Sequence, residues 1–402
     1  MFYFLYLVTM AAAITTGPIV LWHFHLFAPA GPLINLWAVP LIGGLAIPVG
    51  LTGLLLASVW PDGAALCFRF TATMVDQTLK LSEYMLALPI LTPRQIYLPL
   101  SSLIAITLMV AIVLLPWRRW HIPVLLTLLA TLWLWPAPRP QQLRVMALSV
   151  GQGDALLVSD ARGHHYLIDG GGMAQGTFDT GERLVAPALG RLGIKQLTAV
   201  VLSHDHPDHR NGLLHIVKHF AVQEVWCGMP ENELWQPLRE QISSRHIPVR
   251  TFKTGWSTVE DTRTDEIALF VPPQTMASIN DRSLVFYARH KHEGVLLTGD
   301  LESIGVRQLL GTMPKRPVTL LKLPHHGSRY SNIDLLLEYF APTIVFTSLG
   351  RNNSFGFPHR ETMDIVAEKG LPLWRTDLHG TLLFELKNKG WQARSWQSGL
   401  FH

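Results

Sequence analysis

Hydrophobic positions are distributed unevenly along the 402 residues. Only 6 of the 33 lysines and arginines, and only 3 of the 29 aspartates and glutamates, lie before residue 141. Such a nearly charge-free region is what immersion in lipid requires. Four apolar runs are near the roughly 20 residues that a bilayer crossing needs, the last being the shortest. We therefore predict a transmembrane helical region over 1–135, with spans at 3–27, 33–60, 98–115 and 122–135.

A fifth segment of the first region, residues 64–89, has a different pattern. Charged residues interrupt its apolar positions at Arg69, Asp76, Lys80 and Glu83. Charges at helical spacing beside apolar positions favour an amphipathic helix that lies in the membrane interface. We do not expect this segment to span the bilayer.

From residue 143 onward, short apolar runs alternate with segments of helical spacing. The proline-rich stretch at 136–142 indicates a stiff linker in front of them. The pattern predicts a layered α/β domain over 143–402. Strands are expected at 143–158, 166–168, 198–202, 267–271, 284–288, 295–298, 319–323 and 344–347, and helices at 181–192, 211–220, 301–310, 333–339 and 362–367.

The loop at 203–209 holds three histidines and two aspartates directly after an apolar run. A folded core would have to hydrogen-bond or neutralise all five side chains, so packing alone does not explain them. His204 and His206, two positions apart, can offer two imidazoles to one cation. Asp208 and His209 follow where a second cation could bind. The alternative is a histidine-rich surface loop, but short tracts of this kind favour metal binding.

Charge and cysteine usage add little to this prediction. From residue 141 onward the chain has 27 basic and 26 acidic residues, so the charge balance does not indicate a face that binds DNA. Cys67 and Cys227 lie in different parts of the chain, so no disulfide framework is expected.

The histidine loop resembles the signature of the metallo-β-lactamase superfamily, and further motifs follow in the order of that family. Asp169 after an apolar strand matches the aspartate of the family's first motif. Asp300 in Thr-Gly-Asp matches the aspartate that usually bridges two metals, and His326 in His-His-Gly-Ser matches the late histidine. The resemblance implies an αββα sandwich with metals at one edge of its sheets. It also implies a hydrolase whose metal ligands are His204, His206, Asp208, His209, Asp300 and His326.

One family motif is missing. The superfamily usually supplies a third histidine to the first metal, and the counterpart here is residues 278–283, so Asn280 or Asp281 would have to serve. Amide and carboxylate oxygens favour harder ions such as manganese or magnesium. We therefore expect one or two divalent ions, manganese or zinc, with the identity of the metal left open.

Within the superfamily, the chain is similar to the ComEC-type competence proteins, which take DNA through the bacterial inner membrane. The resemblance is carried by Val150 to Asp154, by His325 to Ser328 and by Asn353 to His359, behind a membrane segment. Full-length members carry a further amino-terminal portion. The resemblance implies natural transformation, with DNA as single strand or duplex, membrane lipid and other DNA-uptake proteins as partners.

The expected orientation in the membrane follows from Arg118 and Arg119. These residues lie in the short loop before the last span, and basic loops remain in the cytoplasm. The soluble domain would then lie in the periplasm of a Gram-negative cell, attached to a multi-pass inner-membrane region.

Several polar residues receive supporting roles. Asp205 is a proton acceptor for the attacking water. His215 and His219, one helical turn apart, form either a metal pair or a helix-surface pair, and the second reading is favoured because a site needs further converging ligands. Residues expected to orient ligands or contact substrate are Asp154, Asp169, Asn280, His325, Ser328 and His359.

Three functions remain open at this stage. The first is a metal-dependent phosphodiesterase that degrades the DNA strand that is not imported. The second is a transport or binding component whose metal site does not cut DNA, which the missing histidine favours. The third is a metallo-hydrolase of another substrate, because a fold does not fix its substrate.

Overall fold

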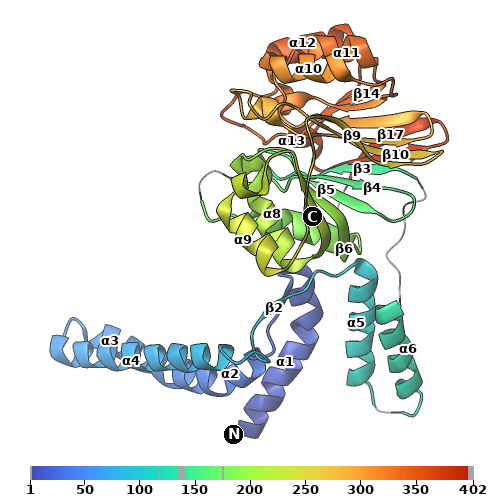
Figure 1. Cartoon of the computed structure of the whole chain (residues 1–402). Coiled ribbons are helices and arrows are strands. Elements are labelled where there is room, and N and C mark those ends of the chain that lie inside the picture. The colour runs from blue at the N-terminus through green and yellow to red at the C-terminus, as the bar shows by residue number, and fades with distance from the viewer. Residues whose placement is uncertain (1, 117, 135–139, 141, 174–175, 397–402) are drawn as a thin grey trace. The chain divides into compact units, whose positions relative to one another are not determined.

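The computed structural model describes all residues except 1, 117, 135–139, 141, 174–175 and 397–402 (Figure 1). The chain forms two compact units, Met1–Trp135 and Pro136–His402. Each unit has its own internal packing and is described by itself.

The first unit is helical. It contains α1 (Phe2–His23), a continuous helix made of α2 (Gly31–Ala38), the π-helical η1 (Val39–Ala46) and α3 (Ile47–Leu56), then α4 (Pro61–Leu86), α5 (Leu100–Leu114) and α6 (His121–Leu134). Among the described residues, Tyr6–His23 and Gly31–Leu56 are long and apolar enough to cross a bilayer. The 15 and 14 residues of α5 and α6 reach about 22 and 21 Å, less than the ~30 Å hydrocarbon core. Helices of this kind fit membrane association.

Helix α4 packs against the helix that precedes it (Figure 1). A Cβ added to Gly53 would lie 2.9 Å from Cβ of Cys67, and the Thr71 hydroxyl donates to the Ala46 carbonyl over 3.2 Å. Small residues at such contacts let two helices approach closely in a membrane. The segment expected to lie at the membrane interface is therefore part of α4, one of two helices that pack against each other. The short strands β1 (Leu26–Phe27) and β2 (Arg94–Gln95) also pair, in antiparallel orientation.

The second unit contains two sheets. The eight-stranded sheet has the order β17-β16-β3-β4-β5-β6-β7-β8, and the seven-stranded sheet has the order β15-β14-β13-β12-β11-β10-β9. The strands of the first are β17 (Gly390–Ser395), β16 (Leu382–Lys387), β3 (Arg144–Ala147), β4 (Leu156–Ser159), β5 (His165–Ile168), β6 (Gln196–Leu202), β7 (Ala221–Cys227) and β8 (Val249–Thr251). Those of the second are β15 (Leu373–Arg375), β14 (Ile344–Thr347), β13 (Leu320–Lys322), β12 (Glu293–Leu297), β11 (Val285–His290), β10 (Asp265–Val271) and β9 (Gly255–Asp261).

Helices cover the outer faces of both sheets (Figure 1). The eight-stranded sheet carries α7 (Ala186–Arg191), α8 (Pro207–His219) and α9 (Gln236–Ser244), and the seven-stranded sheet carries α10 (Ser303–Thr312), α11 (Ile333–Phe340) and α12 (Arg360–Glu368). A short helix, α13 (Thr376–His379), follows β15. The αββα sandwich that the sequence predicts is confirmed.

The main core lies between the two sheets. Val158 and Val201 of one sheet belong to the same buried cluster as Leu269 and Phe286 of the other. The inward positions alternate along the strands, as two packed sheets require. Each fully buried side chain of this size contributes about 1.5–3 kcal/mol to folding, so the interface between the sheets fixes their register.

The structure corrects one predicted strand. Residues 143–158 form two strands, β3 and β4, with a loop between them. Gly151 (φ 84°) and Gly153 (φ 105°) adopt left-handed backbone conformations that end the extended run. Sequence reading also missed β7, β8, β9, β15, β16 and β17 and helix α9.

Strand direction explains where functional side chains gather. Strand β5 runs parallel to β6, and β12 runs parallel to β13. The carboxyl ends of parallel strands meet at one edge of a sheet, and here Asp169, His204, Asp300 and His326 follow these four ends.

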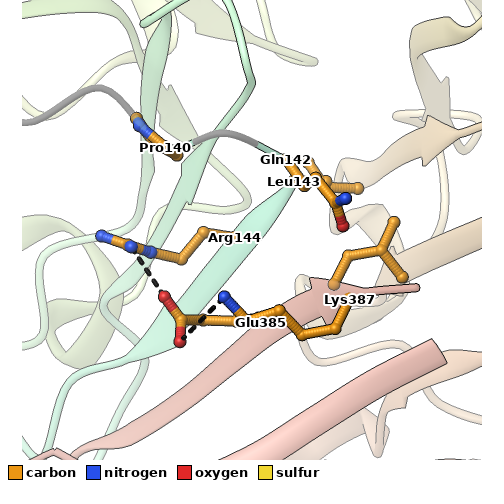
Figure 2. A pocket seen from close by; sticks show the side chains of 7 residues that line it. Pro140, Gln142, Leu143, Arg144, Glu385 and Lys387 are labelled. Carbon is orange, nitrogen blue, oxygen red and sulfur yellow. Dashed lines mark hydrogen bonds and ion pairs between the residues drawn. The ribbon is translucent and has the colours of Figure 1, made fainter. Parts of the chain in front are cut away.

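A small pocket of about 60 Å³ lies at another edge, at the start of β3 and the end of β16 (Figure 2). Figure 2 shows the Arg144 guanidinium pointing at the Glu385 carboxylate, 2.6 Å away. The residues that line the pocket include none of the predicted metal ligands.

Candidate metal centre

Four of the six predicted ligands converge on one point. The ligand atoms of Asp208, His209, Asp300 and His326 all lie within 4.8 Å of one another. Nε2 of His209 is 3.2 Å from Oδ2 of Asp300, and Nε2 of His326 is 3.4 Å from the same oxygen. Oδ2 of Asp208 lies 3.8 and 3.7 Å from the two imidazole nitrogens. These four side chains, which we call the four-residue cluster, form one candidate cation position.

Three separate chain segments supply these side chains. Asp208 and His209 lie in the first turn of α8, Asp300 follows β12, and His326 lies in the turn after β13. His326 has a left-handed φ of 54°, which is costly for a residue with a Cβ. Such strain persists where the surrounding structure imposes it, and it is concentrated at functional sites.

The glycine-rich loop before β4 holds the Asp208 turn in place. A Cβ on Gly153 would lie 2.0 Å from the carbonyl oxygen of Asp208, so this close approach requires glycine. The next amide, that of Asp154, donates to the same carbonyl over 3.2 Å. The loop therefore positions a ligand through the backbone.

The His209 ring is oriented by Asp169. Its Nδ1 lies 2.8 Å from Oδ2 of Asp169, and that carboxylate also accepts hydrogen bonds from the amide and hydroxyl of Ser203. The carboxylate holds a proton on Nδ1, so Nε2 faces the cluster, 3.2 Å from Oδ2 of Asp300. Asp169 thus contacts the ring of a predicted ligand, and its orienting role stays a prediction.

The His326 ring is oriented in the same way by a backbone carbonyl. Its Nδ1 lies 2.7 Å from the Ser348 carbonyl oxygen, which can only accept, so the proton is on Nδ1. Nε2 of His326 and Oδ1 of Asp300 are buried and have no hydrogen-bond partner within the described residues. Buried polar atoms without a partner, in a set of two imidazoles and two carboxylates, fit a divalent cation.

The electrostatics of the cluster also favour a cation. Burial alone would raise the pKa of Asp300, but His326 and His209 hold it well below its usual value. Burial would lower the pKa of His326, yet the Asp300 charge and the Asp208 carboxylate, 3.7 Å from Nε2, raise it to about 10. The carboxylates thus draw positive charge onto the imidazoles, and a metal would displace those protons.

A buried lysine adjoins the cluster and was not singled out by the sequence analysis. Nζ of Lys322 lies 2.7 Å from Asp154 and 4.0 Å from Oδ1 of Asp300, and it donates to the Gly299 carbonyl over 3.0 Å. The signal was present in the sequence, because Lys322 is the one charged residue of the apolar stretch 318–323.

The other two predicted ligands lie beside the cluster. Nε2 of His204 is 3.1 Å from Nδ1 of His206, and the His204 ring is 4.2 Å from the His209 ring between centroids. Burial, followed by the nearby His209, lowers the pKa of His204 well below its usual value, so its imidazole is neutral. Ligation by this pair stays a prediction.

At the position of the missing histidine, Ser283 faces the site. Its hydroxyl is 3.3 Å from Nδ1 of His204 and accepts the Asp300 amide over 3.1 Å. Asn280 instead donates to Glu302 over 2.9 Å, and Asp281 accepts the amides of Glu302 and Gly305. Neither of the two expected substitutes points at His204, because both stabilise the start of α10.

The remaining predicted residues surround the centre without joining the cluster. Asp205 forms an ion pair with Arg210 at 2.6 Å, so its carboxylate already has a partner, and its role as proton acceptor stays a prediction. Nδ1 of His325 is 3.4 Å from Glu302. The Ser328 hydroxyl accepts the Tyr330 amide, and Nδ1 of His359 accepts the Arg329 amide.

The His215 and His219 rings stack with centroids 4.3 Å apart. Asp179 and Glu182 bring carboxylates to within 4.8 Å of the His215 imidazole. The helix-surface pair of the sequence analysis therefore has acidic neighbours, and His215 itself is buried.

Comparisons with known proteins match both parts of the chain. The Metallo-beta-lactamase superfamily model matches residues 148–351, and the Competence protein model matches residues 1–145. ComE operon protein 3 of Bacillus subtilis is 26% identical over 95% of this chain and 52% of its own length. Competence protein ComA of Neisseria gonorrhoeae is 26% identical over 92% of this chain and 50% of its own length. The chain thus spans about half the length of these two relatives.

The solved structures that the chain matches are more distant in sequence. A diphosphatase from the PhnP family is 17% identical with a TM-score of 0.36, covering 61% of this chain and 98% of its own. Zinc-bound PqqB from Methylobacterium extorquens is 11% identical with a TM-score of 0.34, covering 57% of this chain and 87% of its own. From the two family models and the curated relatives together, the chain belongs to the metallo-beta-lactamase superfamily, and within it to the ComEC family of competence proteins.

Proposed function

We propose that the second unit is a metal-dependent phosphodiesterase that cuts DNA strands during uptake, and that it degrades the strand that is not imported. The observation that carries this proposal is the four-residue cluster, in which two imidazoles and two carboxylates converge. Two of its buried ligand atoms, Nε2 of His326 and Oδ1 of Asp300, have no hydrogen-bond partner among the described residues. Membership of a competence family supplies DNA as the substrate to test.

Each group of residues would have a separate chemical role. Asp208, His209, Asp300 and His326 would hold a divalent ion, manganese or zinc. Such an ion supplies Lewis-acid chemistry, making water a stronger nucleophile at neutral pH and offsetting negative charge on a phosphate oxygen. Asp169 and the Ser348 carbonyl keep the two imidazoles in the tautomer that presents Nε2 to the centre. His204 and His206 would contribute a second ion position.

The proposed location is the bacterial inner membrane, with several spans. The helices Tyr6–His23 and Gly31–Leu56 support membrane association. Arg118 and Arg119 precede α6, which by the excess of basic residues in cytoplasmic loops would put the second unit in the periplasm. Incoming DNA, membrane lipid and other DNA-uptake proteins would be the partners.

A second candidate function has its own observation. Ser283 stands where the superfamily supplies a third histidine, and among the described residues one group brings together four candidate ligands. A domain that binds DNA beside a transport channel without cutting it would need only this one group of ligands.

Cleavage of an end-labelled single strand by the detergent-solubilised chain separates the two functions. We expect cleavage that depends on added manganese, and its loss in Asp208→Ala, which removes a ligand oxygen from the cluster. His290→Ala is the matched control, because His290 pairs with Asp265 at 2.7 Å and takes no part in the cluster. Equal cleavage by wild type and Asp208→Ala would refute the nuclease proposal, and no cleavage by either would favour the binding role.

A further inference from the structure

Exposed aromatic rings lie beside the metal centre, in two loops of the second unit. Phe355 and Phe357 stack with centroids 5.6 Å apart and an angle of 13° between their planes. The His359 ring lies 5.1 Å from Phe357, and the Tyr330 ring lies 6.3 Å from His359. Phe355 is 60% exposed and Tyr330 is 57% exposed. We call Tyr330, Phe355, Phe357 and His359 the aromatic platform.

The platform is continuous with the four-residue cluster. The Phe357 ring lies 6.0 Å from the ring of His326, a member of the cluster, and 5.3 Å from the ring of His325. A molecule that stacked on Phe355 would therefore lie two rings away from the proposed metal position. A polymer with several bases in a row can stack along such a path and bring one of its phosphates to the end of it.

Hydrogen bonds fix the loop that carries the platform. The Asn353 side chain donates to the Phe357 carbonyl over 2.8 Å and accepts the Phe357 amide over 2.9 Å. The His359 amide donates to the Gly327 carbonyl over 3.1 Å, which ties this loop to the turn of His326. Preorganised rings lose little conformational entropy when a ligand stacks on them.

The charge around the platform suits an anionic ligand. Residues 351–360 include Arg351 and Arg360 and no acidic residue. The Arg329 guanidinium lies 5.3 Å from the centre of the Tyr330 ring, and it also pairs with Glu361. Aromatic faces interleaved with arginines are typical of surfaces that bind single-stranded nucleic acid, because every base has a face that stacks. A duplex hides those faces.

We propose that the aromatic platform stacks the unpaired bases of a single-stranded nucleic acid and delivers the adjoining phosphate to the four-residue cluster. This inference rests on the proposed function, since it names the form of the substrate at the same site. Stacking contributes about 1–3 kcal/mol per base, so one ring accounts for roughly a fivefold or greater change in affinity.

The test is binding of a fluorescent oligothymidylate to the whole detergent-solubilised chain in EDTA, measured by anisotropy without cleavage. We expect tight binding of the single strand, weaker binding of a duplex of equal length, and at least about a fivefold loss of single-strand affinity in Phe355→Ala, with Phe355→Trp restoring it. Tyr339→Ala is the matched control, because Tyr339 is a similarly exposed aromatic residue on α11 and its ring contacts Phe340.

The results that would contradict the aromatic platform differ from those that would contradict the nuclease proposal. Unchanged affinity in Phe355→Ala overturns the platform, even where the wild type cleaves DNA. Binding that depends on Phe355 in a chain that never cleaves keeps the platform and overturns the nuclease. Phe355→Ala could instead bind vesicles of phosphatidylglycerol less well than wild type while its affinity for oligothymidylate is unchanged. That result would identify the platform as a lipid contact and overturn the proposal.

Discussion

Nζ of Lys322 lies 2.7 Å from a carboxylate oxygen of Asp154, and both side chains are buried at the edge where the metal ligands meet. The pair joins β13 to the loop before β4, one from each sheet. Through the Gly299 carbonyl, Lys322 also holds the turn that carries Asp300. This ion pair thus connects the ligand-bearing loops of the two sheets.

Lys322→Met is expected to destabilise the second unit by about 3–5 kcal/mol, because it leaves Asp154 buried without its partner. Urea unfolding of the second unit measures this loss. The double variant Lys322→Met with Asp154→Leu should recover most of it, since no buried charge remains. Lys389→Met, at an exposed lysine in the β16–β17 turn, is the control. If Lys322→Met alone were as stable as wild type, the Lys322–Asp154 pair would not be structural.

A segment from residue 141 to the end is expected to fold alone. Its two sheets, their shared core and every predicted ligand lie after the linker. Circular dichroism should show a cooperative thermal transition, since a domain of this size unfolds as a unit. A non-cooperative transition would mean that the membrane unit is needed for folding.

A reporter fused to the carboxyl terminus is expected to be active only on the periplasmic side. Arg118 and Arg119 before α6 would be retained in the cytoplasm, so the chain after α6 would be exported. Alkaline phosphatase and a cytoplasmic fluorescent protein, fused in parallel, measure the two sides. Activity of the cytoplasmic reporter alone would reverse the orientation.

The second unit should lose stability in acid through His215. Burial, opposed by Asp179, lowers the pKa of His215 to about 4, against ~6.5 in an unfolded chain. The unfolded state binds a proton first, so the contribution is complete above pH ~6.5 and is lost as the pH falls toward 4, by up to about 3 kcal/mol. Urea unfolding at pH 7.5 and 4.5 should show a smaller pH effect in His215→Gln than in wild type. His246→Gln, at an exposed histidine, should keep the wild-type effect, and an equal effect in all three would contradict the account.

The sandwich could be predicted because its strands carry strong local signals. Apolar runs such as residues 198–202 and 295–298 are strands in the structure, extended by a residue or more in places. Strands β16 and β17 escaped prediction because β16 is defined by its pairing with β3, more than 200 residues earlier in the chain. A single sequence does not reveal such long-range pairing.

The site could be predicted only where motif spacing is local. Asp208 and His209 could be predicted from the spacing of the histidine loop, whereas Asp300 and His326 come from the resemblance to the metallo-β-lactamase superfamily. Ser283 could not be predicted as the residue at the position of the missing histidine, because a hydroxyl is a weaker candidate ligand than the Asn280 amide on residue type alone. The turn that points the Ser283 hydroxyl at His204 is visible only in three dimensions. Lys322 was missed for a related reason, because a partner 168 positions away decides its role.

Metal content tests the central claim most directly. The whole chain, dialysed against manganese and then against metal-free buffer, should retain about one ion per chain by elemental analysis, because one group of four ligands is complete. His326→Ala should retain none, and His290→Ala should retain the wild-type amount. A wild-type chain without metal, or a His326→Ala chain with the same content as wild type, would contradict the account.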